Sequence, residues 1–159
     1  MRTEARQPTV PEALPAPPDE LLASVRTGDL ARDRWTHEAH LAVAWALNRH
    51  RHGPAITLGE LRGLITAYNA VSGLPASRVI CHETITVYYL GAVVALDAPT
   101  VDALYRHPWC ERDAPLRHWR TETLASHAAR RSCVDPDLEP LPFELALDQH
   151  HHATPDPRS

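Results

Sequence analysis

Histidine side chains at the start of two apolar segments are the residues best suited to chemistry in this sequence. His37 and His40 lie three residues apart in the first segment, and His82 lies at the start of the second. Residues spaced i, i+3 share one face of a helix. Three neutral imidazoles form a common first shell for a divalent transition metal. If the two segments pack together, the sequence predicts a metal ion, iron or zinc, bound by His37, His40 and His82.

Other polar residues near these histidines could complete a catalytic site. Glu38 and Glu83 are candidates for a proton carrier, a further ligand or a hydrogen-bond partner of the histidines. Arg78, one helical turn before His82, could bind an anionic substrate, and the Tyr89 hydroxyl could turn into the site. The alternatives are an exposed ion pair for Arg78 and a core position for Tyr89. Three protein ligands leave positions open for water or substrate, as in catalytic metal centres.

The pattern of apolar residues and helix breakers predicts helices that would position these side chains. Asp19 is the predicted N-cap of the first helix and Thr57 that of the third. The segment 77–96 is rich in β-branched residues but is too long for one strand, which favours a buried helix. We expect an all-α, four-helix-type bundle with short additional helices and an extended C-terminal segment. The predicted helices span 19–28, 32–51, 57–72, 77–96, 101–107 and 114–131.

The domain organisation follows from proline and histidine content. Residues 1–18 are rich in proline and are expected to form a disordered arm. Residues 19–148 form a single predicted helical domain, long enough to bury a core without disulfides. Residues 149–159 include three consecutive histidines and are expected to form a disordered tail.

Charge and composition exclude several classes of partner. The formal net charge is −4 and all 16 basic residues are arginine, without a basic stripe for nucleic acid. No apolar stretch reaches the length of a membrane span, and no secretion signal is recognised, so we expect a cytoplasmic protein without a membrane partner. The three cysteines are expected to be reduced thiols. The expected partner is a small molecule, which could be anionic, and a homodimer is compatible with the sequence.

The function predicted from these observations is that of a small metal-dependent enzyme acting on a small molecule. The chain has no GxGxxG, Walker A, GxSxG or HExxH motif, so the sequence names no reaction. The competing interpretations are a non-catalytic accessory protein that binds a metal or ligand, a buried hydrogen-bond network without metal, and ordinary surface histidines. Buried polar groups without partners are costly, which favours a role for histidines that begin apolar helices.

Four short strings also resemble a group of small bacterial helical proteins that has no established activity. These are WTHEAHL (35–41), HETIT (82–86), SHAAR (126–130) and PDLEPLP (136–142). The resemblance covers roughly residues 35 to 142 and implies a helical fold in which the two histidine clusters meet. It implies no catalytic assignment. The predicted ligand set is also similar to that of the DinB-like metalloproteins, in ligand type alone.

Overall fold

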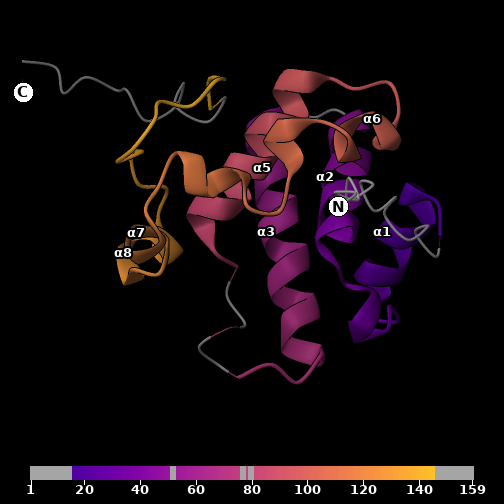
Figure 1. Cartoon of the computed structure of the whole chain (residues 1–159). Helices are drawn as coiled ribbons and strands as arrows, with labels where there is room; N and C mark the ends of the chain where they lie inside the picture. Colours follow the sequence, from indigo (N-terminus) through magenta and orange to yellow (C-terminus); the bar gives the residue numbers. More distant parts are fainter. Residues whose placement is uncertain (1–15, 51–52, 76–77, 79–80, 146–159) are drawn as a thin grey trace, which may run out of the picture.

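The chain folds as an assembly of helices in the computed structural model, which describes residues 16–50, 53–75, 78 and 81–145 (Figure 1). No strand occurs among these residues, which confirms the expected all-α class. The longer helices are α1 (Pro18–Thr27), α2 (His37–Arg49), α3 (Pro54–Val71) and α5 (Glu83–Leu96). The shorter ones are α6 (Val101–Tyr105), α7 (Thr121–Leu124) and α8 (His127–Arg131), with 3₁₀ turns η1 (Arg32–Arg34), η2 (Pro108–Cys110) and η3 (Ala114–Arg117).

Helix α2 lies at the centre of the packing, in contact with α1, α3, α5 and α6. Its buried face contains Ala39, Ala42, Ala44 and Ala46, whose small side chains let the neighbouring helices approach closely. Helix α5 has the other large share of the core and is buried over most of its length. The three helices α2, α3 and α5 are therefore the elements that can enclose a site (Figure 1).

The predicted starts of the first and third helices were wrong, because proline rather than a polar cap sets them. Helix α1 has Pro17 at the N-cap and Pro18 at its first position, so Asp19 lies within the first turn. Helix α3 likewise begins at Pro54, and the Thr57 hydroxyl donates to the Gly53 carbonyl oxygen (3.0 Å). Proline has the φ angle of a helix and needs no hydrogen-bond acceptor for a backbone N–H, which suits it to this position.

Helix α5 confirms the helical interpretation of the β-branched segment from Glu83 onward. Its N-cap is His82, so this helix begins later than the predicted residue 77; residues 76–77 and 79–80 lie outside the described residues. It ends at Leu96, and its C-cap residue Asp97 has a left-handed backbone (φ 42°). Tertiary burial outweighs the strand preference of these residues because most of the helix faces the core.

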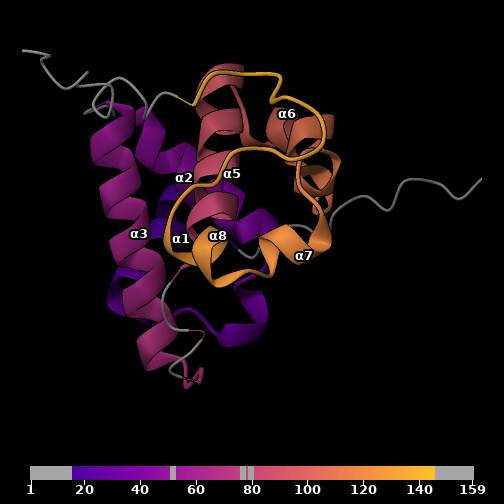
Figure 2. The ribbon, with the colours of Figure 1, turned by 90° about the vertical axis from the view of Figure 1, so that its left-hand side faces the viewer.

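The predicted helix 114–131 is instead three short elements, η3, α7 and α8. Ser126 begins a separate helix by accepting a hydrogen bond from the Ala129 N–H (3.2 Å). The extended C-terminal segment that follows crosses α5 (Figure 2), where a Cβ atom added to Gly91 would lie 2.8 Å from the Phe143 ring. Glycine at 91 therefore permits this close approach.

Both predicted chain ends fall mostly outside the described residues. Residues 1–15 of the proline-rich arm and the whole histidine-rich tail are not described, whereas Pro18 belongs to α1. Within the described ranges, no helix is long and apolar enough to cross a membrane. Cys81, Cys110 and Cys133, all within the described residues, form no disulfide; Cys81 and Cys110 are buried and Cys133 is exposed.

Candidate functional site

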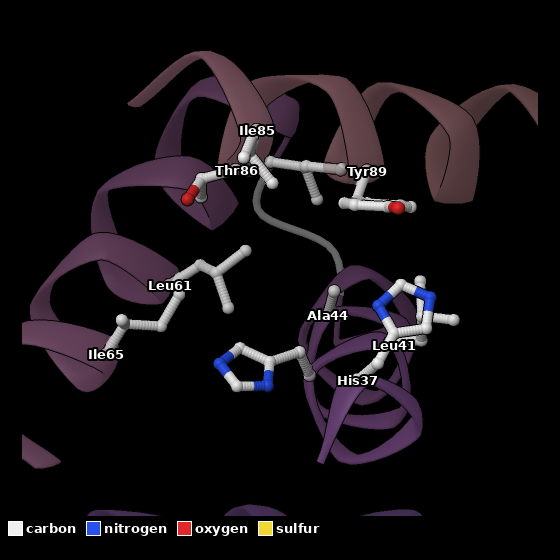
Figure 3. Close-up of a pocket in the computed structure, with 10 residues that line it drawn as sticks. His37, Leu41, Ala44, Leu61, Ile65, Ile85, Thr86 and Tyr89 are labelled. Atoms are coloured by element: carbon white, nitrogen blue, oxygen red, sulfur yellow. The ribbon is translucent and has the colours of Figure 1, made fainter. Parts of the chain in front are cut away.

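A pocket of about 250 Å³ lies between α2, α3 and α5 (Figure 3). Two histidines, a leucine and an alanine of α2 surround it together with mainly aliphatic side chains of α3 and α5, so its walls are mainly apolar. The lining residues are His37, His40, Leu41, Ala44, Leu61, Ile65, Ile85, Thr86, Tyr89 and Leu90. None of these residues is Asp, Glu, Lys or Arg. Ala44 is the smallest of these residues and leaves space beside the imidazoles.

His37 is held at one side of the pocket by the backbone of η2. Its Nε2 atom lies 2.7 Å from the Cys110 carbonyl oxygen, which can only accept, so Nε2 carries the proton. In the neutral ring, Nδ1 is then an acceptor. The ring also meets the Tyr89 ring edge to face at a centroid distance of 4.9 Å, and the two residues lie together in Figure 3. The histidine orientation is thus fixed by contacts with two other elements.

His40 is fixed in a similar way but by its own helix. Its Nδ1 atom donates to the Thr36 carbonyl oxygen at 2.7 Å, and its ring stacks on Trp35 at a centroid distance of 3.7 Å. Burial lowers the pKa of His40 to about 4, with a smaller lowering from the neighbouring His37. The ring is therefore neutral at pH 7, and Nε2 has a lone pair with no hydrogen-bond partner in the described part of the chain.

The hydroxyl groups of the other polar lining residues already have protein partners. The Tyr89 hydroxyl lies 2.7 Å from the Glu111 carbonyl oxygen and 3.0 Å from that of Arg112, and burial raises the Tyr89 pKa. The Thr86 hydroxyl interacts with the Cys81 thiol and lowers its pKa, which burial raises more strongly. Tyr89 therefore lines the pocket with its ring, whereas its hydroxyl, which was expected to turn into the site, joins α5 to the loop after η2.

His82 does not line the pocket with His37 and His40, so the structure does not bring the three predicted ligands together. Its Nδ1 accepts from the Ile85 N–H (3.3 Å) and its Nε2 donates to the Leu124 carbonyl oxygen (2.7 Å). Both ring nitrogens are thus used in capping α5 and joining it to α7. In the described ranges, no group of three or more His, Cys, Asp or Glu side chains is placed to hold a metal ion.

The predicted charged residues also lie outside the pocket. Glu83 forms a bidentate ion pair with Arg62 of α3, with Nε to Oε2 at 2.8 Å. Glu38 lies 3.9 Å from Arg112, measured from Oε2 to Nη2. Arg78 is exposed, and its carbonyl oxygen lies 3.5 Å from Asn69 Nδ2. None of Glu38, Glu83 and Arg78 is a lining residue, so these side chains do not reach the space beside His37 and His40.

Two features of this site could not be predicted from the sequence. The Cys110 carbonyl that holds His37 comes from a distant turn, and no side-chain pattern encodes a backbone acceptor. Leu61 and Ile65 of α3 line the pocket opposite the imidazoles (Figure 3), and this position follows from how α3 packs rather than from a local pattern. Thr36, by contrast, could have been recognised as the N-cap of α2 from its residue type and position.

Comparisons with known proteins do not extend this description. No protein-family model, curated protein sequence or solved structure matches the chain.

Proposed function

We propose that this protein binds a small, largely apolar molecule in the pocket between α2, α3 and α5. The observation that supports this proposal is an apolar pocket in which the ring nitrogens of two histidines are already oriented by bonds to backbone carbonyls. Concave apolar pockets with few polar groups are the usual form of small-molecule sites. For this proposal we treat the four longer helices as a four-helix-type bundle, a fold in which sites form between facing helices.

The size of the pocket limits the ligand. A pocket of about 250 Å³ is below the range typical of drug-sized ligands, roughly 300 to 1,000 Å³. We therefore expect a compact molecule, such as one with a single or fused pair of aromatic rings. Ala44 is the smallest lining residue, so a larger side chain at this position would occupy the space that a ligand needs.

The proposal is tested with Ala44→Leu and a panel of small aromatic compounds that includes indole and benzothiophene. We expect the wild-type protein to bind members of this panel by calorimetry and to melt at a higher temperature with them, whereas Ala44→Leu should show neither effect. The matched control is Ala95→Leu, on an exposed position of α5, which should bind as the wild type does. Absence of binding to the whole panel, or unchanged binding by Ala44→Leu, would contradict the proposal.

A metal-dependent enzyme is the second candidate function. It is favoured by the bonds from His37 Nε2–H and His40 Nδ1–H to backbone carbonyls, since metal-binding histidines usually donate their other ring N–H in this way. An iron or zinc ion would then have two histidine ligands, with the remaining positions filled by water or substrate. Elemental analysis of protein lacking residues 150–159 tests this candidate: near one metal per chain, lost in His37→Ala and in His40→Ala, would support it, and metal-free protein would contradict it.

A further inference from the structure

Two ring nitrogens of the pocket, His37 Nδ1 and His40 Nε2, have a lone pair without a described protein partner and can tell ligands apart. We consider His40, because burial lowers its pKa to about 4 and so keeps its ring neutral at pH 7. Trp35 stacks against the ring, and the Thr36 carbonyl fixes its tautomer, so Nε2 is an acceptor in a set position. The hydroxyls of Thr86 and Tyr89 already have protein partners. A ligand that brings an N–H or O–H group would give this nitrogen the hydrogen bond that the described residues do not supply.

The electrostatic character of the pocket selects against charged ligands. No lining residue is a permanent cation that could pair with a carboxylate or phosphate, and none is an acid that could pair with an ammonium group. Transfer of an unpaired charge into apolar surroundings is costly, and a carboxylate would also face the lone pair of a neutral imidazole. Arg78, the residue expected to attract an anion, is exposed and does not line the pocket.

We infer that the ligand is an uncharged molecule with a compact apolar body and one N–H or O–H group that donates to His40 Nε2. Heteroaromatic amines of the indole type, phenols and small alcohols belong to this class. This inference rests on the proposed function, because it assigns the chemistry of a ligand for the same pocket. It replaces the anionic substrate expected from the sequence with a neutral donor.

Two matched pairs of ligands test the inference on the full-length protein. Indole and benzothiophene have nearly the same shape, but only indole has an N–H donor, so we expect indole to bind about tenfold more tightly by calorimetry. Benzyl alcohol and benzoate are similar in size, and we expect benzoate to bind on the order of a hundredfold more weakly.

The variant His40→Phe tests whether the preference for indole over benzothiophene comes from His40. Phenylalanine keeps an aromatic ring against Trp35 but has no acceptor, so indole and benzothiophene should bind this variant with equal affinity. The control is His82→Asn, outside the pocket, which should keep the preference for indole. Circular dichroism checks that both variants are folded, and the wild-type comparison stands alone if His40→Phe is not.

The outcomes separate this inference from the proposed function. If the wild type binds indole and benzothiophene equally, or benzoate more tightly than benzyl alcohol, the neutral-donor inference is overturned while the pocket remains a ligand site. A preference for indole that persists in a folded His40→Phe variant also overturns it. If none of the four compounds binds, the proposed function fails as well.

Discussion

The first turns of α2 and α5 begin with the same dipeptide but use it differently. His37 and Glu38 are the first two residues of α2. In α5, His82 is the N-cap and Glu83 is the first residue of the helix. In α2 the two histidines line a pocket and each has one ring nitrogen without a described protein partner. In α5 the histidine has both nitrogens in hydrogen bonds to the backbone. Residue type and helical position are nearly the same in the two places, so the difference must come from their neighbours.

The residue before the dipeptide explains the contrast. Thr36 precedes His37, and its hydroxyl accepts from the Ala39 N–H (3.2 Å), so α2 has a cap without using an imidazole. Cys81 precedes His82 and is a poor cap, so the imidazole itself accepts from the Ile85 N–H. A helix must satisfy its first N–H groups. Where a hydroxyl caps the helix, as at α2, the histidines line the pocket, and where none does, as at α5, the histidine itself caps the helix.

The largest expected effect concerns the pH dependence of stability at His40. The pKa of His40 is about 4 in the folded chain, whereas the ordinary value of 6.5 applies to the unfolded chain. Between these pH values the unfolded chain therefore binds more protons than the folded chain. The contribution of this group to the free energy of unfolding therefore has its highest value above pH 6.5. It decreases as the pH drops toward 4, by up to about 3 kcal/mol. Urea unfolding between pH 4 and pH 7 measures this slope.

The variant His40→Phe isolates this contribution from other acid effects. Phenylalanine cannot take up a proton, so its stability should fall less steeply than that of the wild type below pH 6.5. Parallel slopes for the two proteins would mean that the His40 ring is solvated when protonated, and that the pocket is more open to water than its apolar walls indicate.

The second effect is the loss of the framework role of His82. The variant His82→Ala removes the N-cap of α5 and the bond to Leu124, and we expect it to lower the free energy of unfolding by about 2 kcal/mol. Asparagine can still cap the helix, so His82→Asn should lose only about half as much. Denaturation by urea gives both values. An unchanged stability of His82→Ala would show that the contrast between the two helix starts has no energetic basis.

The features that could be predicted from the sequence are those that depend on contacts between residues close together in the chain. The helical class and a long helix that ends at residue 96 follow from periodicity and segment length, and the structure agrees, although this helix begins at Glu83 rather than at the predicted residue 77. The placement of His37 and His40 on one face also follows from helical geometry. The role of His82 could not be predicted, because it depends on a hydrogen bond to the Leu124 carbonyl oxygen. Leu124 belongs to the segment 114–131, which lies beside His82 only in the folded chain. The break within 114–131 arises where short caps and burial outweigh helix propensity.

The third effect concerns Thr36, whose hydroxyl leaves the histidines of α2 free. The variant Thr36→Ala should lower the free energy of unfolding by about 1 kcal/mol, because the Ala39 N–H loses its acceptor. Thr36→Ser keeps a hydroxyl and should be close to wild type. If Thr36→Ala also weakens indole binding, the cap holds His40 in place as well as starting the helix, since the Thr36 carbonyl accepts from the His40 ring. Calorimetry and urea unfolding on the same samples separate the two effects.

The smallest expected effect concerns Glu83, the first residue of α5. Glu83 is 12% exposed and Arg62 45% exposed, and their bidentate pair joins α5 to α3. Because solvent screens a half-exposed partner, we expect Glu83→Gln to lower the free energy of unfolding by only about 0.5 to 1 kcal/mol. The loss should shrink in high salt, and Arg62→Gln should lose a similar amount, with no further loss when both are changed.

Glu38 is the matched position in α2, where Oε2 lies 3.9 Å from Arg112, and Glu38→Gln should cost less than Glu83→Gln. A decrease in indole affinity for Glu83→Gln, without a change in stability, would instead give Glu83 a part in ligand binding and would remove the distinction between a pocket at the start of α2 and a framework at the start of α5.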